Sequence, residues 1–305
     1  MKDIVIIGAG TAGLTAAIYA CRAGKTVSFV ECEAIGGQIS TSPRVENYPG
    51  FESISGAAFS DTLFEQATKL GAELVFGKVV AVKDNGTTKM VVTDSNEEIK
   101  AKAVIIAGGV KHRHMGIEDE TKYMGKGVSY CAVCDGAFYK GKTVAVVGGG
   151  NTALQSAILL AEGCEKVYLI HRRDEFRAEK AVVEQLSKFQ NISLQLSKTV
   201  KALKGEPTLQ EIVLTSTKDG SETTLAAQGL FVTIGQVPDN AIYKDLVELD
   251  AAGFIVADEN CLTKTPGIFV AGDCRTKVVR QLTTAAADGS TAALAACNYV
   301  NSLSF

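Results

Sequence analysis

The chain has 305 residues, 46% of them hydrophobic and 21% charged, and carries a formal net charge of -3. These values are typical of a compact globular protein with room for two domains, and they exclude a disordered chain. Because charges of both signs are mixed along the sequence, nothing marks it as a partner of nucleic acid or of an anionic membrane surface. The first apolar run ends at Gly8, too early for a secretion signal, and no run approaches the roughly 18 residues of a membrane span. We therefore expect a soluble, cytoplasmic protein.

A strand, a glycine-rich turn and a helix open the chain. Residues 4–7 predict a buried strand, and the turn that follows has glycine at Gly8, Gly10 and Gly13. A second strand ends at Glu31. The glycines permit a tight turn and let backbone N–H groups approach a pyrophosphate at the positive end of the helix, while the carboxylate would accept hydrogen bonds from ribose hydroxyls. This pattern predicts a first dinucleotide site.

Short strands separate this unit from a second one of the same kind. They are predicted at 79–82, 90–93, 99–102 and 104–109, with a turn at Asn85-Gly86. The second unit has a strand at 144–147, the turn Gly148-Gly149-Gly150-Asn151-Thr152-Ala153, a helix, and a strand at 167–170. His171 follows Gly148 at the same interval at which Glu31 follows Gly8. Gly148, Gly150, Asn151 and Thr152 are therefore predicted to contact the phosphates of a second dinucleotide.

The two units differ at the tip of their second strand. Where the first has Glu31, the second has His171-Arg172-Arg173, with Arg177 one turn further on. A carboxylate would repel a 2′-phosphate, whereas guanidinium groups bind phosphate in a bidentate manner and stay charged. The first site is therefore predicted to hold a dinucleotide with a free ribose and the second to hold NADPH. A solvated basic patch at the start of a surface helix is the alternative.

The order of these elements indicates that one domain is inserted into another. Strands are predicted at 230–235, 253–256 and 267–271, and an Ala-rich helix at 283–299. We expect one domain to comprise residues 1–112 and 247–305 and the other to comprise residues 113–246. The chain would then pass between the two domains twice at the same place, and these two segments would form a hinge.

The 8 cysteines include one closely spaced pair, Cys131 and Cys134, followed directly by Asp135. Two thiols at this spacing can close a small ring, a helix start lowers the pKa of one of them, and Asp135 could carry the proton that moves when a dithiol forms. Structural zinc, with His112 and His114 as further ligands, is one alternative, and two buried cysteines without chemistry are another. The remaining six cysteines are expected to be structural. Cys274 follows Gly272-Asp273 and is left open.

Taken together, these motifs resemble bacterial-type, low-molecular-weight thioredoxin reductase, a class II pyridine nucleotide-disulfide oxidoreductase. The resemblance runs in order from residue 4 to about residue 296. Besides the two glycine turns and the Cys131–Cys134 pair, the segments that carry it are Gly36-Gly37-Gln38, Glu46-Asn47-Tyr48-Pro49-Gly50-Phe51, His171 to Ala178, and Gly272-Asp273 to Arg280-Gln281.

The resemblance implies a fold, cofactors and a reaction. It implies an α/β protein with two Rossmann-like, three-layer β/β/α domains, the NADPH domain with the cysteine pair being inserted into the FAD domain. Electrons would pass from NADPH through FAD to the Cys131–Cys134 disulfide and on to thioredoxin, with Cys134 as the cysteine nearer the flavin and a homodimer as the usual assembly. The residues implied for FAD are Gly8, Gly10, Gly13, Glu31, Gly36, Gly37, Gln38, Asn47, Asp273, Arg280 and Gln281.

Three departures from the family pattern leave alternatives open. After the second glycine turn the family often carries an acidic residue, where this chain has Asn151. The strand at 104 ends in Ala107-Gly108-Gly109, where a threonine is common in the middle, and the run 111–115 is unusually basic. A paralogue that reduces another protein disulfide, or that takes electrons from a donor such as ferredoxin, would fit these departures. A redox sensor that binds flavin or zinc without turnover is a further alternative.

Overall fold

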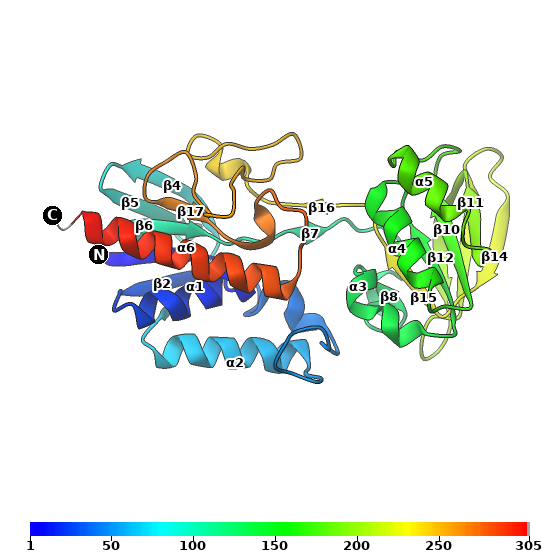
Figure 1. The fold of residues 1–305 in the computed structure, drawn as a ribbon, viewed down its shortest axis with the longest axis horizontal. Coiled ribbons are helices and arrows are strands. Elements are labelled where there is room, and N and C mark those ends of the chain that lie inside the picture. Colours follow the sequence, from blue (N-terminus) through cyan, green and yellow to red (C-terminus); the bar gives the residue numbers. More distant parts are fainter. Residues whose placement is uncertain (304–305) are drawn as a thin grey trace. The chain divides into compact units, whose positions relative to one another are not determined.

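The computed structural model describes residues 1–303 and divides the chain into two compact units (Figure 1). Unit 1 comprises Met1–Lys111 and the chain from Val237 onward, and unit 2 comprises His112–Gln236. The return to unit 1 thus lies before the expected boundary at 246/247. The reason is packing, because Tyr243 and Val247 are buried in a core of unit 1.

Unit 1 is built on a mainly parallel sheet in the order β3-β2-β1-β6-β5-β4, with β17 also paired to β6. Its strands are β1 (Lys2–Ile7), β2 (Val27–Glu31), β3 (Glu73–Phe76), β4 (Val79–Asn85), β5 (Thr88–Thr93), β6 (Glu98–Ile106) and β17 (Ile268–Val270). Its helices are α1 (Thr11–Arg22), α2 (Gly56–Lys69) and α6 (Leu282–Ser302), with short 3-10 turns η1 (Gly37–Thr41), η4 (Ala241–Tyr243) and η5 (Gly272–Cys274).

The alternating side chains of β1 supply both faces of this sheet. Ile4 and Ile6 join the core that is covered by α1 and α6, which lie side by side along the sheet (Figure 1). Val5 and Ile7 join a second core on the other face, under β4 and β5. All four are nearly or fully buried, as the continuous apolar run predicts for a strand covered on both faces.

Unit 2 repeats the plan with a second sheet layer. Its parallel sheet has the order β11-β10-β9-β15-β8, and a three-stranded antiparallel sheet has the order β12-β13-β14. The strands are β8 (Val128–Ser129), β9 (Thr143–Val147), β10 (Lys166–His171), β11 (Ile192–Leu196), β12 (Lys198–Lys204), β13 (Glu211–Ser216), β14 (Glu222–Ala226) and β15 (Gly229–Val232). The helices are α3 (Ala132–Asp135), α4 (Asn151–Ala161) and α5 (Lys180–Leu186), with 3-10 turns η2 (Thr121–Tyr123) and η3 (Gly136–Tyr139).

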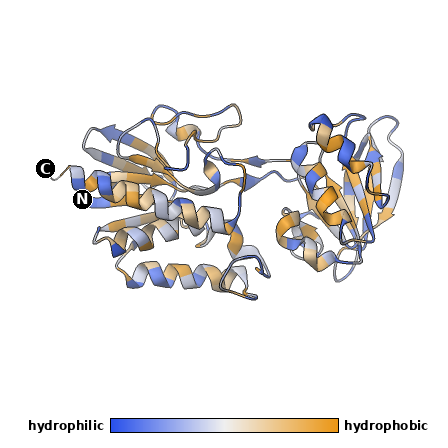
Figure 2. Ribbon diagram, in the orientation of Figure 1, coloured by the Kyte–Doolittle hydropathy of each residue, from blue (hydrophilic) through white to orange (hydrophobic). Residues whose placement is uncertain are grey.

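The two faces of this parallel sheet pack against different layers. Val144 and Val146 of β9 face α4, and Ala145 faces the core beneath the antiparallel sheet. Hydrophobic residues follow α4 and the strands beside it (Figure 2). The layers are therefore helix, parallel sheet and antiparallel sheet, and the predicted α/β fold with Rossmann-like units is confirmed.

Three local expectations differ from the structure. The strands predicted at 99–102 and 104–109 are one continuous strand, β6, because its two halves pair with different neighbours. Residues 253–256 form only isolated bridges, among them Ile255 to Arg275. Helix α2 was not predicted, although Ser55 caps it. The chain passes between the units through β7 (Lys111–His112) and β16 (Gln236–Val237), which pair with each other.

Candidate functional site

Two of the three glycines in the first turn are required by packing within the chain. Gly8 has a φ of +106°, and a Cβ on Gly13 would lie 1.9 Å from the carbonyl oxygen of Gly8. Gly10 is different, because its backbone is extended and a Cβ there would meet only the Gly36 oxygen at 3.8 Å. Folding does not require glycine at position 10. The space above it suits a group that is not part of the chain.

The first turn of α1 offers donors to such a group. Its N-cap is Gly10, which has no side-chain oxygen to accept the first N–H groups of the helix. Beside it the hydroxyl of Thr11 is buried and has no hydrogen-bond partner among residues 1–303. The N-terminus of a helix carries partial positive charge, so this place is suited to a phosphate.

Glu31, at the tip of β2, is held against the same turn. Its Oε2 accepts a hydrogen bond from the Ala9 N–H at 2.8 Å, and its Oε1 accepts from the N–H groups of Cys32 and Glu33, both at 2.8 Å. These bonds fix the carboxylate over the glycine turn. A carboxylate has about four lone-pair positions, so it can still accept hydrogen bonds from ribose hydroxyls.

The second glycine pair lies beside the first turn. Gly36 has a φ of +93°, and a Cβ on it would lie 1.9 Å from the Ser60 hydroxyl oxygen. Its N–H donates to the Ala9 carbonyl at 2.8 Å. Gly37 follows with a φ of +63°, and a Cβ there would lie 3.5 Å from the Cα of Gly10. The structure therefore brings the two predicted glycine segments together.

Three amide side chains predicted to contact the cofactor form hydrogen bonds within the chain. Gln38 donates from its side chain to the carbonyl oxygen of Val110. Asn47 donates to the side-chain oxygen of Gln281 at 3.2 Å, and Gln281 is the N-cap of α6. The segment around Asn47 and the start of the last helix, far apart in sequence, are thus joined.

Asp273 supplies a second buried atom without a partner. Its Oδ1 is buried and has no hydrogen-bond partner among the described residues, and burial raises the pKa of this carboxyl. Neighbouring Gly272 abuts α1, since a Cβ on it would lie 2.8 Å from the Cβ of Ala12. Arg280 donates to the Asp273 backbone oxygen at 3.2 Å, and its guanidinium carbon lies 4.1 Å from the centre of the Phe254 ring.

A charged network that was not predicted from the sequence supports Asp273. The Asp288 carboxylate, from the buried side of α6, accepts hydrogen bonds from the Gly272 N–H at 2.9 Å, from Arg275 at 2.8 and 2.7 Å, and from Lys277 at 2.8 Å. Burial alone would raise the pKa of Asp288, but the hydrogen bonds from Arg275 and Lys277 lower it. The signal in the sequence was that Asp288 is the only charged residue of α6.

These features of unit 1 fit a flavin dinucleotide. The turn after β1, the tip of β2 and the loop after β17 lie at the carboxyl ends of neighbouring parallel strands, where α/β sheets bind nucleotides. There the chain presents open space over Gly10, an uncapped helix end and two buried oxygens in need of partners. A pyrophosphate and a polyhydroxylated chain would satisfy each of them.

The glycine turn of unit 2 follows the same logic. A Cβ on Gly148 would lie 2.6 Å from both the Ala153 Cβ and the Thr233 carbonyl oxygen, so packing requires this glycine. Gly150 is the N-cap of α4, and a Cβ on it would meet nothing within 4 Å. Packing within the chain therefore does not require glycine at Gly10 of the first turn or at Gly150 of the second. Thr152 is exposed in the first turn of α4.

His171, predicted to contact the cofactor, is packed inside the turn. A Cβ on Gly149 would lie 2.1 Å from its ring, and the ring stacks on Phe176 with centroids 5.6 Å apart. Its Nε2 lies 3.1 Å from the carbonyl oxygen of Glu175. Burial lowers the pKa of His171, and the nearby arginines lower it further. The imidazole therefore holds the arginine-bearing loop on the glycine turn.

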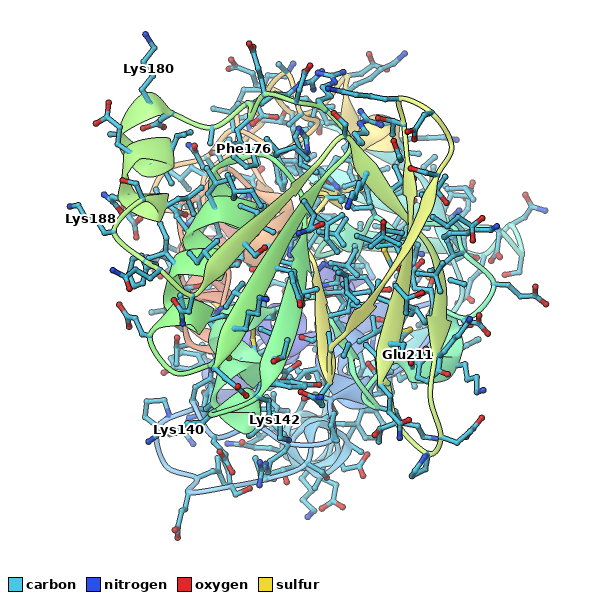
Figure 3. All side chains as sticks on the ribbon, turned by 90° about the vertical axis from the view of Figure 1, so that its right-hand side faces the viewer. Lys140, Lys142, Phe176, Lys180, Lys188 and Glu211 are labelled. Atoms are coloured by element: carbon cyan, nitrogen blue, oxygen red, sulfur yellow. A yellow bond between two sulfur atoms is a disulfide. The ribbon has the colours of Figure 1, made fainter. Side chains whose placement is uncertain are left out.

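The three arginines of this loop are exposed, and none of them forms an ion pair with any residue in the described part of the chain. They are Arg172, Arg173 and Arg177. The Arg177 N–H donates to the Gly149 carbonyl at 2.7 Å. Asn151 forms two hydrogen bonds with Glu179, each of 2.8 Å, and so closes the loop at its other end. Lys180, the next residue after Glu179, extends its side chain into solvent, whereas Phe176 is partly buried against the core of unit 2 (Figure 3).

Cys131 and Cys134 form a disulfide, with their Cα atoms 5.3 Å apart. Cys131 is the N-cap of α3, and its sulfur accepts the Cys134 N–H at 3.2 Å. Asp135 ends this helix. Burial raises the pKa of its carboxyl, and a 2.6 Å hydrogen bond from the Ser129 hydroxyl partly offsets that rise. A reducible pair and a partly buried acid are therefore adjacent.

The two histidines considered as zinc ligands both contact the Tyr130 ring. His112 stacks on the Tyr130 ring at 4.9 Å, and His114 contacts the edge of the same ring at 5.4 Å. Among residues 1–303 no group of three or more His, Cys, Asp or Glu side chains could hold a metal ion. Since the two sulfurs are bonded to each other, they are not thiolate ligands in this state.

Cys274 is fully buried beneath the candidate flavin site. Its thiol donates to the carbonyl oxygens of Ile106 and Ala271, at 3.6 and 3.4 Å, and burial raises its pKa to about 12. Since the side chain is fully buried, the thiol is not accessible to a disulfide of another protein. Cys32, which was expected to be structural, is exposed.

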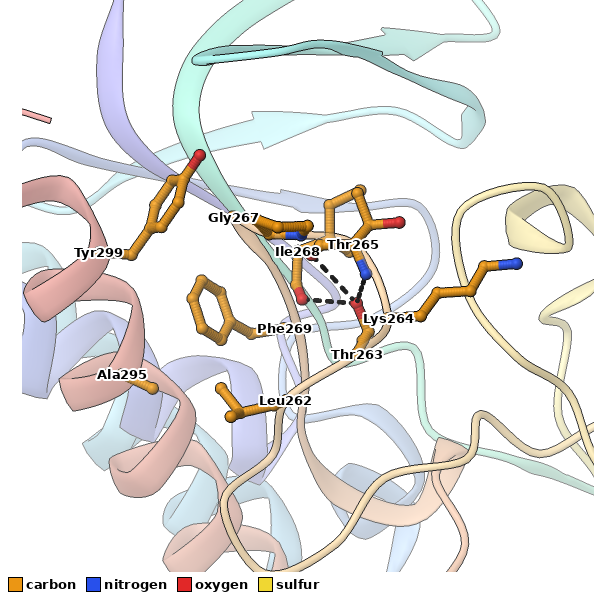
Figure 4. A pocket seen from close by; sticks show the side chains of 10 residues that line it. Leu262, Thr263, Lys264, Thr265, Gly267, Ile268, Phe269, Ala295 and Tyr299 are labelled. Carbon is orange, nitrogen blue, oxygen red and sulfur yellow. Dashed lines mark hydrogen bonds between the residues drawn. The ribbon is translucent and has the colours of Figure 1, made fainter. Parts of the chain in front are cut away.

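One cavity of unit 1 lies away from the features described above. It is about 300 Å³ and is lined by β17, the loop before it and the later part of α6 (Figure 4). Leu262, Phe269 and Tyr299 give it an apolar wall. The glycine turns and the cysteine pair contribute nothing to its lining.

Comparison with known proteins agrees with this arrangement. A family model described as pyridine nucleotide-disulphide oxidoreductase matches residues 2–289. The thioredoxin reductase of Mycoplasma genitalium is 43% identical over 293 residues, covering 96% of this chain and 93% of that protein. A Clostridium pasteurianum protein described as a 34.2 kDa protein in rubredoxin operon is 42% identical over 299 residues, covering 98% and 97%. The crystal structure of thioredoxin reductase from Streptococcus pyogenes matches with a TM-score of 0.95 and 38% identity over 99% of both chains.

Within residues 1–303, no helix combines the length and the hydrophobicity that a transmembrane helix needs.

Proposed function

Since the chain belongs to the pyridine nucleotide-disulphide oxidoreductase family, we propose that it is a flavoprotein that reduces the disulfide of thioredoxin. The observation that carries this proposal is the Cys131–Cys134 disulfide next to Asp135. It lies in the same unit as a glycine turn that is followed by a loop with exposed arginines. A disulfide reductase needs these three parts, namely a site for the electron donor, a reducible sulfur pair and a group that carries protons.

The two units would hold different cofactors. In unit 1 FAD would lie with its pyrophosphate over Gly10, its ribose at Glu31 and its ribityl chain at Asp273. In unit 2 NADPH would lie with its pyrophosphate over Gly150 and its 2′-phosphate among Arg172, Arg173 and Arg177. Bound flavin supplies the chemistry that protein side chains lack, because it accepts a hydride from a nicotinamide and delivers two electrons to a disulfide.

The remaining steps belong to the protein. Reduction of the disulfide by two electrons and two protons leaves the Cys131 and Cys134 thiols. The thiolate of Cys131 attacks one sulfur of the thioredoxin disulfide, which forms a mixed disulfide and releases a thiolate. Cys134, proposed as the cysteine nearer the flavin, then attacks the Cys131 sulfur and restores the disulfide. Asp135 accepts and returns the proton during these exchanges.

Anaerobic titration of the purified protein tests this proposal. Addition of NADPH should bleach the flavin absorbance, NADH should do so far less effectively, and oxidised thioredoxin should restore it. A Cys131→Ser, Cys134→Ser double variant should still be bleached but should not reduce thioredoxin. A flavin that stays oxidised with excess NADPH would sink the proposal.

The arginines are tested separately. Arg172→Ala with Arg173→Ala should raise the KM for NADPH at least tenfold and leave that for NADH nearly unchanged, because only the 2′-phosphate contacts are lost. Lys188→Ala, which removes an exposed cation outside the loop, is the matched control.

A paralogue with another protein substrate or another electron donor is the second candidate. One observation favours it, namely the close relative from Clostridium pasteurianum, whose description places it in a rubredoxin operon. If the double arginine variant reduces thioredoxin as fast as the wild-type protein does, the result would support a donor other than NADPH. Normal bleaching by NADPH without reduction of thioredoxin would instead indicate another protein disulfide.

Assembly and location complete the proposal. We propose a homodimer acting in the cytoplasm, as the family resemblance implies. Sedimentation equilibrium measures the assembly directly, and a monomer at micromolar concentration would contradict it.

A further inference from the structure

The hydroxyl of Ser129 connects the backbone of the cysteine pair to the carboxylate of Asp135. Ser129 ends β8 and is 6% exposed. It donates to Asp135 Oδ2 at 2.6 Å and accepts a hydrogen bond from the Cys131 N–H at 3.1 Å. Its other donor contact, to the Cys131 carbonyl oxygen, is longer at 3.4 Å. The shorter contact decides where the hydroxyl proton lies, so the chain runs from Cys131 N–H through Ser129 to the carboxylate.

We propose that Ser129 is a positioning residue for thiol–disulfide exchange, which fixes the Asp135 carboxylate beside the cysteine pair so that this carboxylate can accept and return a proton. This inference rests on the proposed function. Asp135 lies on α3, a single helical turn, and a short element of this kind cannot by itself hold a side chain in one orientation. A hydrogen bond from the neighbouring strand supplies the missing restraint.

The proton balance shows what the restraint does. Attack on a protein disulfide requires the thiolate, so the proton of the Cys131 thiol passes to Asp135 and from there to the first thiolate that the substrate releases. When Cys134 attacks in turn and closes the disulfide, its proton follows the same route to the second substrate thiolate. A dithiol and a disulfide are exchanged, with no outside oxidant. Because Ser129 donates to Oδ2, the other carboxylate oxygen, Oδ1, is not engaged by it and can receive the proton.

The surroundings of Asp135 make the serine influential. Burial raises the pKa of this carboxyl, and the Ser129 hydrogen bond acts against that rise. Besides the cysteine thiols of the reduced enzyme, the titratable side chain coupled to Asp135 is Tyr139, whose own pKa is raised above its ordinary value by burial and which therefore stays neutral while Asp135 titrates. Neither α4, which packs against α3, nor β15, which pairs with β8, carries a charged residue. The Ser129 hydroxyl on β8 therefore stabilises the ionised carboxylate without help from a charged residue on α4 or β15.

Removing the hydroxyl should therefore shift a pH profile rather than abolish activity. In Ser129→Ala the Asp135 carboxyl binds its proton up to a higher pH, and the pH at which exchange reaches half its maximal rate should rise by about one unit. Ser129→Thr keeps the hydroxyl and should restore the wild-type midpoint. Asp135→Asn should remove this transition from the profile.

The experiment is a single-turnover reaction between the prereduced holoenzyme and oxidised thioredoxin, followed by stopped flow across the whole pH range in which the holoenzyme stays folded. Reduction of the flavin by NADPH does not involve the cysteines, so its rate reports whether each variant is folded and loaded. A Ser129→Ala profile with an unshifted midpoint, or slowed equally at every pH, would overturn the positioning role. Failure of the proposed function looks different, because then the wild-type enzyme itself does not react with thioredoxin.

Discussion

Replacing Asp288 by asparagine should destabilise unit 1 more than most single substitutions. The carboxylate is the shared partner of Arg275 and Lys277, and the three side chains are 7%, 4% and 6% exposed. The asparagine side chain would keep the shape but would lose the negative charge and would direct an amide N–H₂ at a guanidinium. Two buried cations would then lack a counter-charge. Breaking a buried ion pair from one side costs about 3–5 kcal/mol, a large part of the stability of an ordinary domain.

The loss should be visible where the network lies. Hydrogen exchange of α6 and β17 amides should speed up by a factor that corresponds to this free energy, because these elements flank the Gly272–Asp273 loop. Flavin content should fall in the same variant, since the Gly272 N–H loses its acceptor and Asp273 its support. Urea unfolding followed by circular dichroism gives an independent measure of the change.

Two comparisons make this reasoning refutable. Glu65→Gln removes an exposed carboxylate that pairs with Lys69 on the surface of α2, and it should leave exchange and unfolding unchanged. Adding Arg275→Met to the Asp288 variant should recover part of the loss, because one unpaired cation is then gone. If the free energy of unfolding of Asp288→Asn lies within about 1 kcal/mol of the wild-type value, as for ordinary surface substitutions, the network does not support unit 1 in this way.

Three further outcomes are expected. Gly10→Ala and Gly150→Ala should fold normally, because a Cβ at either position meets little or nothing of the chain. Gly10→Ala should lower the flavin content, and Gly150→Ala should raise the KM for NADPH. Gly163→Ala, equally open but distant from both turns, should change neither. Gly13→Ala should instead destabilise the protein itself in thermal unfolding, since its Cβ would lie 1.9 Å from the Gly8 oxygen, and a normal melting temperature would contradict this. Burial, together with the charge of His114, lowers the pKa of His112 from 6.5 to about 4. As the pH falls, the unfolded chain therefore binds a proton at this histidine before the folded protein does. Unit 2 should lose stability between pH 6.5 and pH 4 for this reason. His112→Phe keeps the stacking on Tyr130 and should flatten that pH dependence, measured by the urea midpoint at each pH.

The local patterns of the sequence were sufficient for the fold and for the chemistry of the two turns. Gly8 and Gly13 could be recognised because backbone stereochemistry and close packing within a few residues dictate them. The contrast between Glu31 and the arginines after β10 was equally local. Helix α2 also had a local signal, Ser55 followed by Phe59 and Leu63 at helical spacing, which the prediction did not use.

The roles of individual residues could not be assigned in this way. Tertiary packing placed His171 inside its turn, whereas Glu31 at the same position of the first unit is held by backbone donors. It also distinguished Gly10, which the chain does not need as glycine, from Gly8, which it does.

The sequence by itself therefore determined which segments form the two nucleotide units and which of their tips carries negative or positive charge, because those features depend on residues that are neighbours in the chain. Only the tertiary structure decided that Asp288 is bound to Arg275 and Lys277, and that Ser129 is bound to Asp135. The physical reason is that a buried charge or hydroxyl is satisfied by whatever partner the packing of separate elements brings to it. No spacing rule along the chain encodes that partner.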